Sequence, residues 1–255
     1  KSLGEVGKRP FAEGEEHHEK KVKVSRPLEK YEVRRVYSIV IISLLSVIFW
    51  IFWYLTYVIL YDYMPKFIDD KVGTFTVPTS WLDSLNGLGC IILGPILGAL
   101  WYKLSQRPQG DWSLYKKASI ALFLLGVTFG ILALTEIVRG VGAPETQKAS
   151  ILWVILFFIV MSVAEMFFSP LGASFVSKYA PKHILSIMMA VWIVATFGAA
   201  KGYSLVYELV AELPIVQVSL GIGGICVVVG LVVFIFEKKL ASLVELREGE
   251  TLVED

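Results

Sequence analysis

Long apolar stretches separated by short polar segments dominate the sequence. A helix needs about 20 apolar residues to cross the ~30 Å hydrocarbon layer of a membrane. Because the apolar residues are continuous rather than alternating, the pattern predicts an all-α membrane protein with six transmembrane helices. These helices are expected over Val36–Tyr61, Leu85–Leu104, Ala118–Val138, Ile151–Val176, Leu185–Val206 and Ile215–Phe236.

Composition supports the membrane assignment and excludes several other classes of protein. Apolar residues make up 55% of the 255-residue chain and charged residues 18%, with a mean hydropathy of +0.65. These values lie outside the range of soluble domains. The net charge of +1 does not favour nucleic-acid binding. The sequence offers no nucleophile with a nearby base, no phosphate-binding glycine turn and no metal-ligand cluster, so we expect neither an enzyme nor a metal site.

Lysine and arginine are unevenly distributed among the connections. They are concentrated before the first span, in the second and fourth connections, and after the last span, where Lys238 and Lys239 follow each other. Basic residues in short loops stay on the cytoplasmic side, so both termini are predicted to be cytoplasmic in a protein of the cell membrane. We expect a polar cytoplasmic linker over 1–35, the six-helix bundle over 36–236 and a cytoplasmic tail over 237–255.

Two charged side chains, Glu165 and Lys201, lie well inside predicted spans. A charge near the bilayer centre costs about 2.5–3.5 kcal/mol, so each needs a partner or an aqueous cavity. Counted along their helices at 1.5 Å per residue, the two differ in height by about 6 Å. One interpretation is therefore a structural ion pair, which could also act in gating. The other is a charged site that faces a central cavity.

Polar and helix-breaking residues accompany Glu165. Ser169 lies one turn later, and Pro170 removes a backbone N–H beside the carboxylate. In the second span, Asn86 lies near one end and Pro95 in the middle, so both prolines predict interrupted helices. Free polar backbone at membrane depth is tolerated where it lines a cavity, as in the central sites of transporters.

A family resemblance begins with these residues. The pattern comprises Glu165, Ser169, Pro170, Gly172, Ser174, Lys178, Ala180, Pro181, Met188, Met189 and Trp192. It resembles the signature of the proton-dependent oligopeptide transporters, a branch of the major facilitator superfamily. Weaker similarity lies at 3–8, at the Phe49-Trp50 pair and at 84–87 with Pro95. The resemblance covers essentially the whole chain, but only the C-terminal six-helix half of such a transporter.

The resemblance implies a bundle of two inverted three-helix repeats and a role for particular residues. Glu165 is expected to bind the amino terminus of a peptide with Ser169 nearby, Asn86 to bind the peptide backbone, and tryptophans to shape side-chain pockets. The expected substrate-binding residues are Glu165, Ser169, Asn86, Trp50, Trp53 and Trp192. The implied partners are di-/tripeptides, the lipid bilayer and an N-terminal six-helix half. Protons are the implied coupling ion, and no other cofactor is expected.

Departures from the family pattern leave other functions open. Tyr54 and Leu55 stand where the family carries a polar pair such as Glu-Gln, and Lys201 stands where an uncharged residue is expected. If Lys201 pairs with Glu165, it competes with a peptide ammonium group. The alternatives to a proton-coupled peptide symporter are a non-transporting scaffold or accessory subunit, or a symporter of another small solute. The chain begins with Lys rather than Met, from which we expect a further segment upstream.

Overall fold

Six helices in the described part of the chain are long and apolar enough to cross a membrane. The computed structural model describes residues 26–250, so most of the predicted linker and the last residues of the tail lie outside it. The helices are α1 (Lys30–Phe67), α2 (Thr79–Ser105), α3 (Leu114–Arg139), α4 (Leu152–Phe168), α5 (Gly172–Tyr179), α6 (Leu185–Val210), α7 (Ile215–Ile235) and α8 (Glu237–Ala241). α4 and α5 together form one span, so the expectation of six spans is confirmed.

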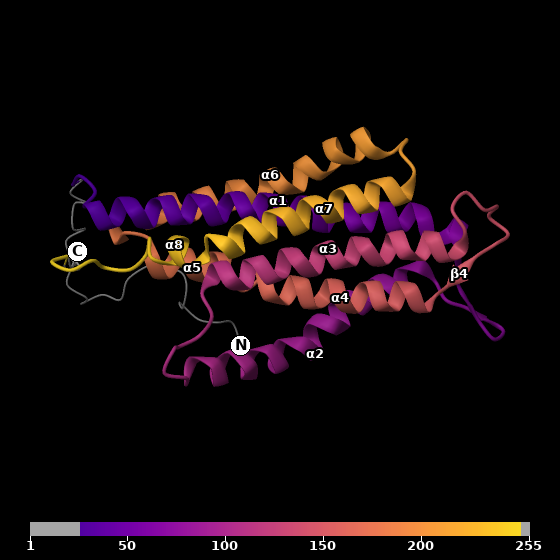
Figure 1. Ribbon diagram of the computed structural model, residues 1–255, viewed down its shortest axis with the longest axis horizontal. Coiled ribbons are helices and arrows are strands. Elements are labelled where there is room, and N and C mark those ends of the chain that lie inside the picture. Colours follow the sequence, from indigo (N-terminus) through magenta and orange to yellow (C-terminus); the bar gives the residue numbers. More distant parts are fainter. Residues whose placement is uncertain (1–25, 251–255) are drawn as a thin grey trace, which may run out of the picture.

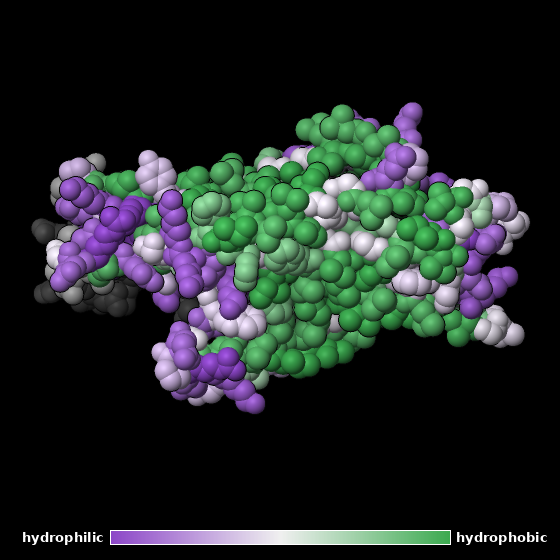
Figure 2. Space-filling view, in the orientation of Figure 1, coloured by the Kyte–Doolittle hydropathy of each residue, from purple (hydrophilic) through white to green (hydrophobic). Residues whose placement is uncertain are grey.

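The helices run side by side along the long axis of the molecule, and their connections lie at its two ends (Figure 1). An apolar band covers the middle of the visible face, and hydrophilic residues gather at both ends (Figure 2). We call the end that carries the connections α1–α2, α3–α4 and α6–α7 the strand end, and the end that carries α8 the tail end. This distribution fits a protein whose middle lies in hydrocarbon, which makes it an integral membrane protein.

α3 forms the centre of the bundle. It packs against α7 on one side and α4 on the other, while α1 packs against α6 and α2 against α4. In the most apolar part of α3, 67% of the residues are buried, against 11% in α2 and in α6. Figure 1 shows α2 diverging from the bundle toward the tail end and α6 diverging toward the strand end. These two helices therefore present long apolar faces that the described chain does not cover.

α1 is longer than predicted at both ends. It begins at Lys30, where the Glu29 N–H donates to the Glu32 carboxylate over 2.9 Å in a capping box. Arg26 adds two hydrogen bonds of 2.8 Å to the same carboxylate. The basic residues that mark the end of the apolar stretch thus lie inside the helix, because a capped helix continues past the membrane boundary.

Short strands at the strand end were not predicted. β1 (Ile68–Asp69) pairs in parallel with β4 (Ala149–Ser150), and β2 (Lys71–Val72) forms a hairpin with β3 (Phe75–Thr76). Gly73 turns this hairpin with a φ of 64°, a conformation that favours glycine. The β1–β4 pair ties the connection after α1 to the connection before α4.

The tail folds back onto the start of α1 at the tail end. Arg34 donates to both carboxylate oxygens of Glu250 over 2.9 and 2.7 Å, and it also reaches the backbone carbonyl of Glu245. Arg35 donates to the carbonyl of Val244. The Arg34 guanidinium lowers the pKa of the Glu250 carboxyl to about 2, so this ion pair persists in mildly acidic solution.

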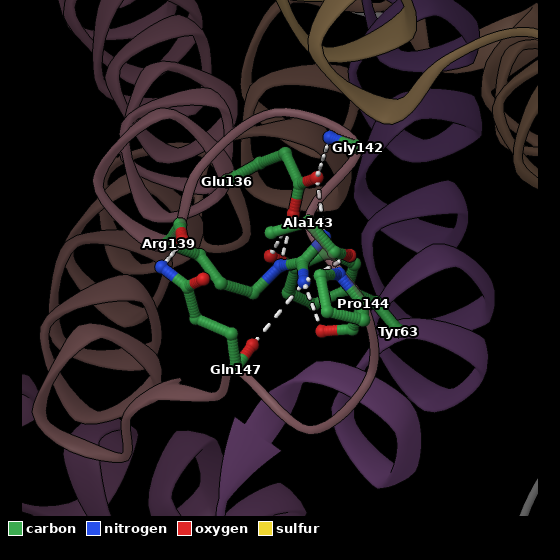
Figure 3. Close-up of polar contacts among 7 residues, drawn as sticks. All are labelled: Tyr63, Glu136, Arg139, Gly142, Ala143, Pro144 and Gln147. Carbon is green, nitrogen blue, oxygen red and sulfur yellow. Dashed lines mark hydrogen bonds and ion pairs between the residues drawn. The ribbon is translucent and has the colours of Figure 1, made fainter.

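A buried polar cluster holds the strand end together (Figure 3). Arg139 donates to the two oxygens of Glu136 over 2.7 and 2.6 Å, and Tyr63 of α1 donates to Glu136 over 2.6 Å. The remaining Arg139 donors reach the carbonyls of Ala143, Pro144 and Gln147. Each charge thus has an opposite charge and further hydrogen bonds, as burial requires.

We predict that Glu136→Gln lowers the free energy of unfolding by about 3–5 kcal/mol, because it leaves the buried Arg139 charge without its counter-ion. Chemical unfolding of the detergent-solubilised protein measures this loss. Asp62→Asn is the matched control, since Asp62 forms an exposed pair with Lys66 and should cost less than about 1 kcal/mol. Equal losses for the two variants would contradict the assignment of Glu136 as the anchor.

Candidate functional site

Glu165 is half-buried in α4 and is held by uncharged groups from α2. The Asn86 side-chain amide donates to the Glu165 carboxylate over 3.0 Å and to the Ser162 hydroxyl over 3.2 Å. Cys90, one turn along α2, lies near enough to the carboxylate to interact with it electrostatically. The structure therefore brings together two of the predicted site residues, Glu165 and Asn86. Sequence reasoning did not assign Cys90 or Ser162 to this group.

A glycine lets α2 approach α4 at this level. A Cβ atom built on Gly89 would lie 2.6 Å from the Ser162 hydroxyl oxygen and 2.8 Å from the Ser162 Cβ. Any side chain at position 89 would therefore push the two helices apart. The absence of that side chain allows Asn86, three residues earlier, to reach Glu165. Gly89 thus sets the distance on which the polar contacts depend.

The helix is interrupted just after Glu165. α4 ends at Phe168, and α5 begins at Gly172, with Pro170 in the gap. Proline has no N–H for the helical hydrogen bond, so the turn is completed by other groups. The Ser174 hydroxyl donates to the carbonyls of Pro170 and Leu171 over 2.6 and 3.1 Å. Ser169 lies exposed in this gap, one turn from Glu165.

The interruption expected at Pro95 is absent, which corrects the prediction from sequence. α2 runs unbroken from Thr79 to Ser105 with Pro95 inside it. A single proline removes one hydrogen bond, and in a transmembrane helix its neighbours can satisfy the freed group. Proline alone therefore does not end a helix at membrane depth. At Pro170, by contrast, the regular pattern is lost, and the Leu171 N–H donates to the carbonyl of Phe168 over 3.1 Å instead.

Aromatic side chains of α1 line the region beside the α4 interruption. Trp50 lies edge-on to Trp53 with ring centroids 5.2 Å apart, and it contacts Phe168 of α4 at 6.5 Å. Further along α1, Tyr54 lies 5.5 Å from the Tyr203 ring of α6. A cavity of about 380 Å³ is lined by Trp53, Tyr54, Tyr57, Val58 and Tyr203. Trp53 thus lines this cavity and Trp50 packs against Trp53, whereas Tyr203 was not foreseen. A role of the two tryptophans in substrate binding stays a prediction.

Trp192 occupies a different place from the α1 tryptophans. It projects from α6 against the first residue of α5, Gly172. Its ring therefore lies beside the α4–α5 interruption rather than next to Trp50 or Trp53. The residue types of this region could be read from the sequence, but the separation of Trp192 from the α1 tryptophans could not.

Lys201 and Glu165 do not form an ion pair within residues 26–250. Lys201 is exposed on α6, and Glu165 takes its hydrogen bonds from α2. Nine residues separate Lys201 from Trp192, which is two and a half turns at about 3.6 residues per turn, so the two side chains project from opposite faces. The comparison of heights on which the predicted pair rested ignored this rotation about the helix axis. A role for Lys201 in gating stays a prediction.

A second cavity of about 470 Å³ lies at the strand end. Its walls come from α1, α3, α6 and α7 and are mostly apolar, with Glu136 and Arg139 at the wall. Because these two charges already bind each other, the cavity offers no free charge from them. It belongs to the packing of the strand end rather than to the group around Glu165.

Taken together, the fold and the group around Glu165 define a six-helix membrane bundle with a half-buried carboxylate in its fourth span. Residues 12–220 match the POT family (PTR2). The match covers most of the chain, and the chain belongs to this family.

Curated relatives place the chain within one part of a longer sequence. It is 31% identical over 173 residues to the "Di-/tripeptide transporter" of Lactococcus lactis subsp. cremoris, which covers 67% of this chain and 33% of the relative. It is also 31% identical over 172 residues to the "Uncharacterized transporter YclF" of Bacillus subtilis (strain 168), covering 68% of this chain and 33% of that protein. The matched region thus spans about a third of the length of these relatives.

Solved structures show the same fold. A crystal structure of the peptide transporter POT in complex with sulfate superposes with a TM-score of 0.76 at 22% identity, over 87% of this chain and 44% of that one. A POT family transporter in complex with 5-aminolevulinic acid gives a TM-score of 0.75 at 23% identity, over 86% of this chain and 44% of the other. The six-helix unit therefore corresponds to less than half of each structure.

We predict that Gly89→Ala lowers the free energy of unfolding by about 1–3 kcal/mol, because the added methyl group must push α2 from α4. Equilibrium unfolding in detergent provides the measurement. Gly98→Ala in the same helix is the control, since its Cβ meets no atom within 4 Å. If Gly89→Ala is as stable as Gly98→Ala, the close approach of the helices is not what holds Asn86 at Glu165.

Proposed function

We propose that this chain forms the C-terminal half of a proton-coupled di-/tripeptide symporter and that Glu165 receives the peptide ammonium group. The supporting observation is that Glu165 is half-buried and, among the described residues, accepts its hydrogen bond from the uncharged amide of Asn86. An anion at membrane depth gains most from a positively charged partner, and none of the described lysines or arginines pairs with it. A desolvated ammonium group supplies that charge.

The neighbouring groups suit the rest of a short peptide. Asn86 carries both donors and an acceptor in its amide, so it can exchange a bond to Glu165 for one to the peptide backbone. Trp50, Trp53 and Trp192 offer apolar walls for side chains of differing size. Ser169, exposed in the α4–α5 gap, adds a hydroxyl near the ammonium position.

The names of the relatives support the same substrate class. The Lactococcus relative is a di-/tripeptide transporter, and the matched structures include peptide transporters. Because the matched region spans only about a third of such a relative, we expect transport to require a second six-helix unit, and with it the groups that complete the peptide site. In this proposal the two six-helix units rock about the site at the membrane midplane, and protons drive uptake.

The uncovered faces of α2 and α6 are where we propose that the second six-helix unit packs. Both helices are far less buried than α3, and α6 carries the charge of Lys201 within its apolar span. Facing lipid, that charge would cost about 2.5–3.5 kcal/mol. Facing a second bundle, it can pair with an acceptor there. The excess of basic residues at the tail end supports a cytoplasmic location for both termini.

We predict that Glu165→Gln lowers the kcat/KM of peptide uptake about 10–150-fold, because the amide loses a charge-assisted hydrogen bond of about 1.5–3 kcal/mol. The full-length protein in proteoliposomes, supplied with labelled Ala-Ala and an inward proton gradient, gives the rate. Glu145→Gln, in the exposed α3–α4 connection, is the control for removing a carboxylate. Uptake by Glu165→Gln at the rate of this control would contradict the assigned role.

We predict that Lys201→Met weakens the association of the two halves more than tenfold. It removes one partner of the proposed charged pair between the halves, and truncating one partner of a buried pair costs about 2–5 kcal/mol. Co-purification of this chain with the cognate six-helix half, expressed as a separate chain, measures the association. Lys201→Arg keeps the charge and is expected to bind as the unchanged chain does. Undiminished binding by Lys201→Met would show that the lysine does not face the partner.

A non-transporting scaffold is the second candidate function. The observation that favours it is that Tyr54, at a position where the family carries a polar group, packs against Tyr203 in an aromatic cluster. A full-length chain that reaches the membrane but takes up no peptide would support the scaffold. Peptide uptake by the unchanged protein would exclude it.

A further inference from the structure

Among the described glycines, Gly172 leaves the least room for a Cβ atom, because the Trp192 ring packs directly against it. A Cβ atom built on Gly172 would lie 1.8 Å from Cζ2, 2.0 Å from Cη2 and 2.5 Å from Cε2 of the Trp192 ring. The indole therefore occupies the space that a side chain at position 172 would fill. We call this space the Gly172 socket.

The socket is rigid on both sides. The ring is a fused planar system that cannot bend, so a methyl group at position 172 would have to displace it as a whole. Moving the nearest ring atom from 1.8 Å to the 3.4 Å at which ordinary contact begins takes a shift of about 1.6 Å. The backbone side is fixed by the Ser174 hydroxyl, which bonds the carbonyls of Pro170 and Leu171.

The Gly172 socket lies close to Glu165 along the chain. Gly172 follows Glu165 by seven residues, and the helix is interrupted between them at Pro170. The Trp192 ring thus packs against the first residue of α5, just after that interruption. Trp192 is only half-buried, so one part of the ring remains open to whatever occupies the region.

We propose that Gly172 is a positioning residue that holds Trp192 back from the substrate space, and that the seated ring leaves room for a bulky apolar side chain of the peptide. This inference rests on the proposed function and names the substrates that depend on the socket. When the ring is seated, its face forms a floor for an aromatic or large aliphatic side chain. When it is displaced, the ring takes that volume, and only small side chains fit.

The test compares two dipeptides in proteoliposomes that contain the full-length protein. We expect Gly172→Ala to lower kcat/KM at least tenfold for Ala-Phe and no more than about threefold for Ala-Ala. In a Trp192→Ala background no ring remains to be displaced, so adding Gly172→Ala is expected to change neither value. Gly130→Ala in α3 is the control, because its Cβ meets no atom within 4 Å.

The outcomes separate this inference from the function on which it rests. Uptake by the unchanged protein, with equal losses of the two peptides in Gly172→Ala, overturns the socket and leaves the proposed function standing. Absence of uptake by the unchanged protein overturns both. If Gly172→Ala does not accumulate in the membrane, Trp192→Ala and the double variant decide. Equal selectivity of these two variants supports the socket, and a difference between them overturns it.

Discussion

The need to satisfy a carboxylate at membrane depth governs the architecture around Glu165. Hydrocarbon offers no water to solvate the group, so the protein must supply donors or open a path to solvent. The donors come from α2, and they reach Glu165 only because Gly89 allows α2 and α4 to pack closely. Five residues after Glu165 the helix is interrupted at Pro170, which has no N–H for the helical hydrogen bond. Packing and polarity are thus inseparable in this region.

Two carboxylates in the bundle illustrate the difference between a charge that is neutralised within the fold and a charge that could bind a cationic ligand. Glu136 is fully buried and binds Arg139 through both oxygens, with Tyr63 as a further donor. Its charge is neutralised within the fold, and it joins α1 to α3. Glu165 is half-buried and has only neutral partners. Within residues 26–250, the fold therefore leaves this half-buried negative charge without a cation, at the place where the family resemblance expects a peptide amine.

Helix number and the identity of the central carboxylate could be predicted from sequence, because both depend on the composition of single segments. Features that depend on which face of a helix a residue occupies, or on how closely two helices pack, could not be predicted from sequence. Lys201 has a suitable height but lies on the opposite face of α6 from Trp192. Cys90 lies in an apolar segment, and its nearness to Glu165 depends on how α2 packs against α4. Ser162 lies three residues before Glu165 on the same helix, so helical spacing alone would have found it.

The ion pair between Arg34 and Glu250 brings the first helix and the final described residues to the same corner of the molecule. In such a six-helix unit, the start of the first helix and the described part of the tail lie side by side, outside the apolar band. It follows that the unit can be exchanged between relatives by cutting outside this corner, with no new junction inside the bilayer. Chimaeras joined there would keep every interhelical contact of the unit, and they offer a direct route to learning which half determines the choice of cargo.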